Sequence, residues 1–244
     1  MRTPQVIDFH THILPGMDDG SRNTQMSIEM LSRMKEQGVD VAVATPHFYG
    51  YREEVSRFLE RRRASFEKLL CEHQEEHPQI ILGAEVTFYS GLSRLEELNS
   101  LCIENTNTLL LEMPFSPWTG YEYDVLESLC FDRHLQVVLA HYERFAQLQK
   151  NSDFYKRVLR LPVKVQINAE SLLPLFKRNQ WIDMFRNGQA QLIGSDCHNL
   201  SSRAPNLLSA RTIIQKRLGA SALEKIDEEA VELLMKNMTA DSAV

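Results

Sequence analysis

Short apolar runs alternate with longer segments of helical periodicity along the chain. The runs are rich in β-branched residues and are bounded by turn residues, which is typical of strands buried in a parallel sheet. We expect strands at residues 6–10, 39–45, 80–86, 108–113, 136–141, 163–168 and 190–196. Strand–helix alternation repeated about seven times predicts parallel βαβ units, in a doubly wound sheet or a closed barrel.

Helical spacing is clearest in three segments, at residues 53–77, 203–219 and 221–238. The second of these ends in Gly219, which is a plausible C-cap because glycine tolerates the backbone conformation that ends helices. No linker, low-complexity segment or internal repeat interrupts the chain. We therefore predict one α/β domain over residues 1–244.

Composition excludes several classes of protein. The chain has 244 residues, a net charge of -6 and 25% charged residues, which suits one large globular domain without the basic surface of a nucleic-acid binder. Its opening lacks the apolar core of a signal peptide, and no apolar run reaches transmembrane length. The four cysteines, Cys71, Cys102, Cys130 and Cys197, form no CxxC pair. We expect reduced thiols, no membrane insertion and a cytoplasmic location.

Nearly every predicted strand delivers a His, Asp or Glu to its C-terminal end. These residues are His10, His12, His47, Glu85, Glu112, His141, Asp196 and His198, and the sixth strand ends at Asn168. In βα barrels the catalytic groups gather at this end of the strands. Glu85 and Glu112 each interrupt an apolar run, and buried carboxylates are rare unless they are paired or bind a metal.

The spacing of these residues suits metal binding. Side chains alternate along a strand, so His10 and His12 point the same way, as do Asp196 and His198. Imidazole and carboxylate together favour zinc, manganese or iron over calcium. A single histidine at a strand end is usually a satisfied core or loop residue, but the coincidence across six strands favours a cluster of two or three ions.

Two arginines extend this picture toward phosphate chemistry. Arg144 follows His141 by three residues, and Arg203 follows His198 by five. A guanidinium group offers a fork of donors that matches phosphate oxygens, although each arginine alone could equally form a surface salt bridge. Metal ions and arginines at one barrel mouth indicate phosphate ester hydrolysis.

The ordered motifs resemble those of one superfamily. The segments are DFHTHILPGMDDG, ATPH, GAEV, LLLEMP, AHYERF, QINAESLL and GSDCHN, followed by Arg203. From about residue 6 to residue 206 they are similar to the polymerase-and-histidinol-phosphatase (PHP) superfamily. More narrowly, they resemble the bacterial metal-dependent tyrosine phosphatases of capsule and exopolysaccharide operons. The resemblance implies a distorted seven-stranded (β/α)7 barrel of PHP type, in agreement with the predicted strand count.

The resemblance also implies three metal positions. The first would be held by His10, His12, Glu85 and Asp196, with Glu85 bridging to a second completed by Glu112 and His141. The third would be held by Asp19, His47 and His198. Arg144 and Arg203 would bind the phosphoryl group, and Asp18 would be an outer or loop residue. Manganese is the expected metal, with iron or zinc as alternatives.

The implied activity is metal-dependent hydrolysis of a phosphomonoester, in which a metal-activated hydroxide attacks phosphorus. The expected substrate is phosphotyrosine on a tyrosine kinase or chain-length regulator of polysaccharide export, or on the C-terminal tail of such a kinase. Aromatic residues in segments 47–52 and 113–123 either sandwich the phenyl ring or pack against the barrel rim. The arginine run 61–63 either attracts an acidic tail or forms a solvated helix face.

Several alternatives stay open at this point. A PHP enzyme for a small ester such as histidinol phosphate would use the same ligands, and a non-catalytic, metal-binding regulator would bind a partner without turnover. Cys197 and Arg203 match the C-x5-R spacing of thiol phosphatases, but the residues between them lack the glycines of a phosphate-cradling loop. His73 and His77 either bind zinc or lie at the exposed end of a helix. Residues 238–244 lack tyrosine, so they give no sign of self-dephosphorylation.

Overall fold

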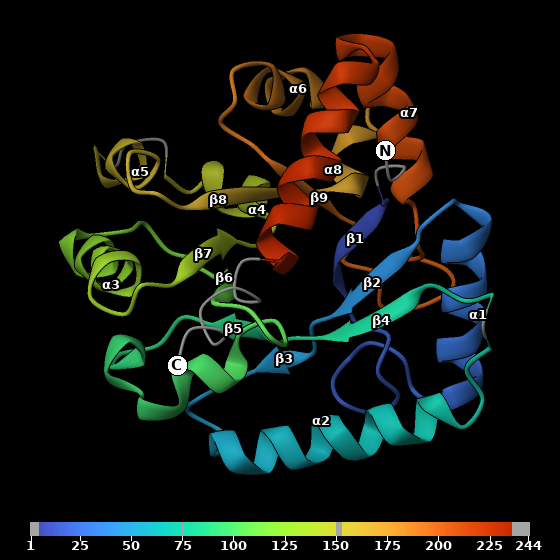
Figure 1. Ribbon diagram of the computed structural model, residues 1–244. Coiled ribbons are helices and arrows are strands. Elements are labelled where there is room, and N and C mark those ends of the chain that lie inside the picture. The colour runs from blue at the N-terminus through green and yellow to red at the C-terminus, as the bar shows by residue number, and fades with distance from the viewer. Residues whose placement is uncertain (1–4, 75, 150–152, 236–244) are drawn as a thin grey trace, which may run out of the picture.

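The computed structural model describes residues 5–74, 76–149 and 153–235 (Figure 1), so the C-terminal segment 238–244 lies outside it. Every pair of neighbouring strands is parallel, in a three-stranded sheet of order β1-β2-β4 and a six-stranded sheet of order β3-β5-β6-β7-β8-β9. The strands are β1 (Ile7–Thr11), β2 (Val41–Ala44), β3 (His47–Phe48), β4 (Gln79–Leu82), β5 (Glu85–Thr87), β6 (Thr108–Glu112), β7 (Gln136–Leu139), β8 (Lys164–Asn168) and β9 (Leu192–Gly194).

The last strand returns to the first, which curls the two sheets into one barrel. Beyond β9, the Asp196 amide donates to the carbonyl of His10 at 2.8 Å, and the His12 amide donates to the carbonyl of Cys197 at 2.9 Å. β2 and β4 continue almost directly into β3 and β5, so the strands occupy seven positions around the barrel. The distorted (β/α)7 barrel is therefore confirmed, and the doubly wound alternative is wrong.

The predicted strand 80–86 is divided in two. β4 pairs with β2 in the smaller sheet, whereas β5 pairs with β3 and β6 in the larger one. The change of sheet occurs at Gly83, where a Cβ atom would lie only 3.3 Å from side-chain carbons of Ile103 and Thr45. Glycine allows this close approach where the strand changes sheets, and Glu85 follows at the beginning of β5.

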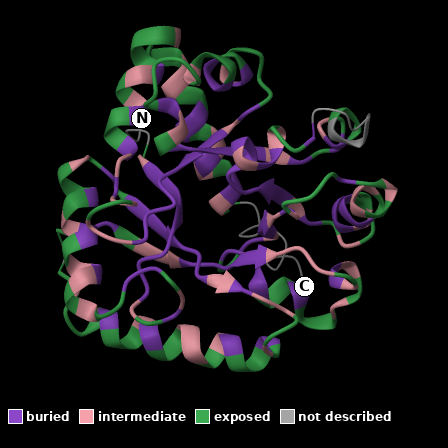
Figure 2. Ribbon diagram, turned by 180° about the vertical axis from the view of Figure 1, so that it is seen from behind, coloured by how far each residue is buried: buried purple, intermediate pink, exposed green. Residues whose placement is uncertain are grey.

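The helices surround the strands, with their exposed faces outward (Figure 2). They are α1 (Thr24–Glu36), α2 (Val55–Leu70), α3 (Gly120–Phe131), α4 (Tyr142–Ala146), α5 (Asp153–Val158), α6 (Arg178–Arg186), α7 (Leu207–Leu218) and α8 (Ala220–Met235), with short 3-10 helices at Leu92–Arg94, Glu96–Leu101 and Ala169–Leu172. The helix predicted at 53–77 already ends at Leu70. Gly219 ends α7 as predicted, with φ of 91° and its amide donating to Gln215.

A small apolar core fills the barrel and seals one end of it. It combines strand residues such as Phe9, Val43 and Leu110 with Ala230 and Leu233 of α8. Thr108, the first residue of β6, donates its hydroxyl hydrogen to the carbonyl of Leu233 at 2.9 Å, so α8 covers the N-terminal end of the strands. The opposite end is left for the polar residues. None of the helices in the described part of the chain has the length and apolar composition needed to cross a bilayer.

Candidate metal centre and active site

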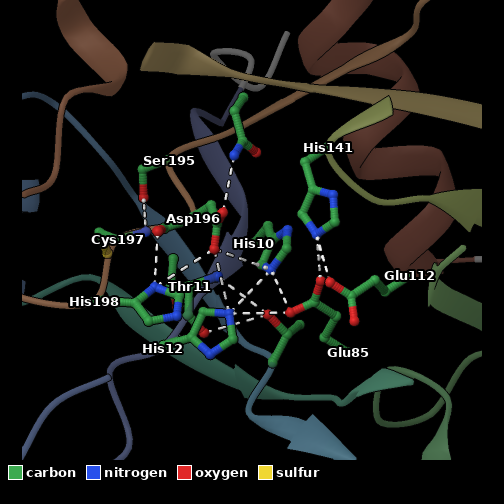
Figure 3. A network of polar contacts seen from close by, with 12 residues as sticks. His10, Thr11, His12, Glu85, Glu112, His141, Ser195, Asp196, Cys197 and His198 are labelled. Carbon is green, nitrogen blue, oxygen red and sulfur yellow. Dashed lines mark hydrogen bonds and ion pairs between the residues drawn. The ribbon is translucent and has the colours of Figure 1, made fainter. Parts of the chain in front are cut away.

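The nine residues predicted as metal ligands come together at the C-terminal ends of the strands. In Figure 3, His10, His12, Asp196 and His198 point toward a common centre, with His141 and Glu112 beside Glu85. Asp19 and His47 approach the same place from the loop after β1 and from β3. Strands far apart in sequence therefore contribute to one cluster, as the strand-end pattern predicts.

The first group of contacts surrounds the two histidines of β1. The Nε2 atoms of His10 and His12 are 3.1 Å apart, and each lies 3.2 Å from Oε2 of Glu85. Asp196 Oδ1 lies 3.5 Å from His10 Nε2 and 3.4 Å from His12 Nε2. Two imidazole nitrogens and two carboxylate oxygens thus face one point, which suits a divalent transition metal.

The second group uses the other oxygen of Glu85. Oε1 of Glu85 lies 2.7 Å from Nε2 of His141, and Glu112 Oε1 lies 3.4 Å from the same nitrogen. The second oxygen of Glu112 accepts a hydrogen bond from the Thr87 hydroxyl at 2.9 Å. Glu85 therefore stands between two groups of ligands, as a bridging carboxylate would.

The third group lies on the outer side of the cluster. Asp19 Oδ1 is 3.5 Å from Nε2 of His47 and 3.4 Å from Nε2 of His198. Asp19 is 68% exposed, unlike the buried residues of the first group. His12 can also supply a ligand atom to this group, so it stands between the first and third positions rather than at the first alone.

Unpaired polar atoms show that this cluster fits metal ions. Among the described residues, Glu85 Oε2, Asp196 Oδ1 and His198 Nε2 are buried and make no hydrogen bond. Leaving such atoms unsatisfied is costly, whereas metal coordination satisfies them. Burial raises the pKa of Glu85, but the charges of His10 and His47 outweigh it and hold that pKa well below its usual range. Glu85 is thus ionised, as a carboxylate that binds a cation must be.

Two of the candidate ligands have strained backbones. His141 has a φ of 29° and Asp196 a φ of 53°, in the region that side chains with a Cβ rarely adopt. Such strain costs about 1–3 kcal/mol per residue and persists only where surrounding contacts enforce it. The Asp196 amide is held by the carbonyl of His10, and the His141 amide by Gln166 Oε1 at 2.9 Å. The strain aims both side chains into the cluster.

Asp18 is an outer residue, as predicted, and it orients two histidines. Its Oδ2 accepts from His12 Nδ1 at 2.7 Å and from the backbone amide of His47 at 2.9 Å. His198 is oriented similarly, because its Nδ1 donates to the carbonyl of Asp196 at 2.9 Å. In both His12 and His198 the Nδ1 hydrogen is engaged, so the Nε2 atom of each ring faces the cluster.

Both predicted arginines reach the edge of the cluster. Nη2 of Arg144 and Nη2 of Arg203 each lie 2.7 Å from Oδ2 of Asp196. Each side chain is about one third exposed, at 34% and 29%, so part of each guanidinium group faces solvent. The two arginines thus place positive charge beside the candidate ligands, where the oxygens of a phosphoryl group can reach it.

Aromatic rings flank the cluster on two sides. The ring of Tyr49 stacks on His47, with centroids 5.3 Å apart, and Arg52 lies 4.5 Å above the same tyrosine ring. The ring of Phe115 stacks on His141 at 6.2 Å with an interplanar angle of 21°, and it remains 56% exposed. The two histidines that carry these rings contact different oxygens of Glu85, His47 at Oε2 and His141 at Oε1.

The interpretation of the arginine run 61–63 as a solvated helix face is wrong for Arg61 and Arg62, which bind groups within the molecule. Arg61 pairs with Glu53 and donates to the carbonyl of Met17 at 2.6 Å. Arg62 donates to the carbonyl of Gly83 at 2.7 Å. Only Arg63 lies on the solvated face. Arg61 and Arg62 therefore anchor the loop that carries Asp19 and the bend at Gly83 that precedes Glu85.

His73 and His77 lie in a turn after α2, so the expectation of an exposed helix end is wrong. His77 is buried, with Nδ1 accepting from the Gln74 amide and Nε2 lying 3.2 Å from the Ser32 hydroxyl. His73 Nε2 lies 3.1 Å from the carbonyl of Pro78. Both ring nitrogens of His77 are thus engaged, so this pair does not offer zinc two free ligand atoms.

Cys197 is unsuited to nucleophilic attack. Its side chain is fully buried, and burial raises the pKa of the thiol to about 12, with Asp8 contributing in the same direction. A thiol phosphatase needs a thiolate at neutral pH, which requires a lowered pKa. The match to the C-x5-R spacing is therefore a coincidence of sequence.

Comparison with known proteins agrees with this geometry. A family model described as "Capsular polysaccharide synthesis, CpsB/CapC" matches residues 6–236. The chain is 30% identical over 243 residues to "Tyrosine-protein phosphatase YwqE" of Bacillus subtilis (strain 168), covering 96% of this chain and 93% of that protein. It is 27% identical to "Tyrosine-protein phosphatase CpsB" of Streptococcus agalactiae serotype III (strain NEM316), covering 95% and 99% of the two chains.

Solved structures give the same result. The fold is similar to a structure reported for YwqE from Bacillus subtilis and CpsB from Streptococcus pneumoniae, described as "unique metal-dependent tyrosine phosphatases". The TM-score is 0.81 at 25% identity, with 96% of each chain covered. A D-hydantoinase, at a TM-score of 0.54 and 12% identity over 92% of this chain and 68% of the other, shares the fold alone. Because the family model matches nearly the whole chain, this protein belongs to the CpsB/CapC family of capsular polysaccharide synthesis.

Proposed function

We propose that this protein is a metal-dependent phosphatase that hydrolyses phosphotyrosine at the strand-end cluster. One observation carries the proposal. Buried ligand atoms of histidine, aspartate and glutamate that make no hydrogen bond converge beside two arginines that share an oxygen of Asp196. The relatives named above are tyrosine phosphatases, which supports the same activity here.

Three ions fit the three groups of contacts. The first ion would be held by His10, His12, Glu85 and Asp196. The second would be held by Glu85, Glu112 and His141, and the third by Asp19, His47 and His198. His12 stands at the border of the first and third positions. Manganese, and in its place iron or zinc, suits this mixture of imidazole and carboxylate. Such ions lower the pKa of coordinated water and neutralise charge on phosphoryl oxygens.

The protein side chains bind and orient the substrate. Arg144 and Arg203 bind the non-bridging oxygens of the phosphoryl group and offset the charge that develops there. Phe115 and Tyr49 provide apolar faces for the phenyl ring, which sits between a phosphoryl group at the cluster and a peptide in solvent. A tyrosyl leaving group has a reference pKa near 10, so it needs less protonation than an alkyl alkoxide.

The proposed partner is the phosphotyrosine-bearing kinase or chain-length regulator of polysaccharide export, bound through its phosphorylated C-terminal tail. The capsular polysaccharide description of the family supports this choice. The whole chain acts as one domain in this proposal. A cytoplasmic location agrees with the four cysteines, which are all free thiols as expected in a reducing compartment.

The test compares substrates on the manganese-loaded protein. Phosphate release is measured from a phosphotyrosyl peptide, from the phosphoseryl peptide of the same sequence and from histidinol phosphate. We expect the highest kcat/KM for the phosphotyrosyl peptide. A higher value for histidinol phosphate would show instead a phosphatase for small esters. If the metal-loaded protein releases phosphate from none of the three substrates, the result would favour the non-catalytic regulator.

A further inference from the structure

One buried side chain outside the nine candidate ligands contacts several of them at once. Gln166 lies on β8 and is fully buried. Its Oε1 lies 3.1 Å from His10 Nδ1 and 2.9 Å from the backbone nitrogen of His141, while its Nε2 lies 2.8 Å from Asn168 Oδ1. Asn168 Nδ2 in turn lies 2.9 Å from Asp196 Oδ2. Two amides thus connect three candidate ligands that come from three strand ends.

The structure makes room for this arrangement. β9 lies between β8 and β1, and its last residue is Gly194. A Cβ atom on Gly194 would lie 2.7 Å from Cβ of His10 and 3.0 Å from Nε2 of Gln166. Any side chain at this position would displace both residues. Glycine therefore allows Gln166 to reach across β9 to the histidine of β1.

The ends of this connection fix the direction of every hydrogen bond in it. An ionised carboxylate only accepts, so the Asn168 amide must turn its NH2 group to Asp196 and its oxygen to Gln166. Gln166 must then donate through Nε2 and accept through Oε1. The backbone N–H of His141 independently requires an oxygen at the same place. Both ends of the connection thus give the same orientation of the Gln166 amide.

We propose that Gln166 and Asn168 form an amide relay that fixes His10 as its Nδ1–H tautomer and locks His10, His141 and Asp196 together as metal ligands. Because Gln166 Oε1 only accepts, the hydrogen of His10 must reside on Nδ1, and the Nε2 lone pair faces Glu85 and Asp196. Gln166 also holds the amide of His141, whose backbone is strained. It is a positioning residue, and the proposal rests on the metal binding proposed above.

The first test reads the tautomer directly. Zinc-loaded protein labelled with 15N-histidine is studied by NMR, with His10 assigned by comparison with a His10→Gln sample. We expect hydrogen on Nδ1 and metal on Nε2 of His10. Metal bound through Nδ1, or a hydrogen on Nε2, would overturn the relay. This measurement needs no substitution at Gln166 and therefore does not depend on whether a variant folds.

The second test compares two buried glutamines. Gln166→Met removes the relay at similar size. Gln149→Met is the matched control, because Gln149 is equally buried and holds the Trp118 amide and the Ser116 carbonyl, both at 2.7 Å, away from the candidate ligands. Zinc affinity is measured by competition with a chelating dye. We expect roughly 10- to 100-fold weaker zinc binding in Gln166→Met, and unchanged binding in Gln149→Met.

The outcomes separate the relay from the metal centre. Equal zinc affinity in wild type and Gln166→Met would overturn the relay while leaving the metal centre in place. Equal losses in Gln166→Met and Gln149→Met would assign the effect to general destabilisation, which also overturns it. If the wild-type protein binds no zinc, the metal centre itself is wrong and the relay falls with it.

Discussion

Asp196 connects the metal cluster with both arginines through its two carboxylate oxygens. Oδ1 faces the Nε2 atoms of His10 and His12. Oδ2 accepts hydrogen bonds from Arg144, Arg203 and the side-chain amide of Asn168. Burial raises the pKa of Asp196, but the charge of His10 and contacts with His12 outweigh it and hold that pKa well below its usual range. One ionised side chain therefore links the candidate metal ligands of β1 with both arginines.

Replacing Arg144 tests this arrangement at the level of one side chain. Arg144→Ala removes a charged donor from the expected position of the phosphoryl oxygens. We expect kcat for the phosphotyrosyl peptide to fall by roughly 10²- to 10³-fold, the usual cost of removing one such donor. The exposed Arg186, which pairs with Asp183 on α6, is the control. If Arg144→Ala has the kcat and the metal content of the wild type, Arg144 has no role in catalysis.

Phe115 tests the selection of an aromatic substrate. Phe115→Ala removes an exposed ring that stacks on His141. We expect KM for the phosphotyrosyl peptide to rise several-fold because the apolar face for the phenyl ring is lost, while an alkyl phosphate is hydrolysed as before. Phe131→Ala on α3, a similarly exposed phenylalanine, should change neither. Equal effects on aromatic and alkyl substrates would contradict the assigned role.

At this scale the sequence predicts chemically distinctive residues best. Histidines and acids at strand ends stand out against apolar runs, and all nine come together in the structure. Gln166 was missed because a buried amide resembles any satisfied core residue. The one available indication was that Gln166 and Asn168 interrupt an apolar strand two residues apart, and hence face the same side.

At the scale of elements, the loop after β1 is held in place by helix α2. Arg61 donates to the carbonyl of Met17, and the Ser65 hydroxyl donates to the carbonyl of Pro15 at 2.8 Å. This loop carries Asp18 and Asp19, so α2 sets the position of the third group of candidate ligands. A helix that contributes no ligand thereby supports metal binding.

Arg61→Ala should release this loop. We expect weaker metal binding, because Asp18 would no longer hold His12 and His47 in place, together with a loss of about 1.5–3 kcal/mol of folding free energy from hydrogen bonds to a charged group. Metal affinity and urea denaturation measure the two effects. Arg63→Ala, which removes only an exposed pair with Glu67 on the same helix, is the matched control. The same metal affinity in both variants would exclude a role for α2 in the site.

The elements show where sequence patterns stop being informative. Apolar runs located the seven positions around the barrel, because burial on both faces leaves a clear pattern. They did not predict the two-residue strand β3, which follows the run 39–45. They could not predict that the run 80–86 divides between two sheets, since the bend depends on the approach of Ile103 and Thr45 to Gly83. The helix predicted at 53–77 was too long because its apolar spacing continues into a turn that tertiary contacts hold.

At the scale of the whole molecule, one end of the barrel provides stability and the other provides chemistry. The apolar core and α8 close the N-terminal end, whereas charged groups that repel or attract one another fill the C-terminal end. Without ions, His141 holds a proton between the carboxylates of Glu85 and Glu112. Burial lowers the pKa of His141, but hydrogen bonds to Glu112 and Glu85 outweigh it and raise that pKa to about 9.

This pKa shift predicts that the Tm of the metal-free protein and the gain in Tm on adding metal change with pH in opposite directions. The usual pKa of histidine is 6.5, so the stabilisation from protonated His141 is fully present below pH 6.5 and is lost as pH rises through about 9. The Tm of chelator-treated protein should therefore fall across this range. The gain in Tm on adding manganese should grow over the same range, because metal binding requires neutral imidazole. A Tm of the stripped protein that rises with pH in this window would contradict the assignment.

The most direct test of the account is phosphate release from a phosphotyrosyl peptide before and after removal of the metal. Wild-type protein and Cys197→Ala are stripped with a chelator, assayed, reloaded with manganese and assayed again, with metal content measured at each step. We expect no release from either stripped protein and full recovery in both after manganese is returned. Activity in fully stripped protein, or its loss in metal-loaded Cys197→Ala, would contradict catalysis by the metal centre.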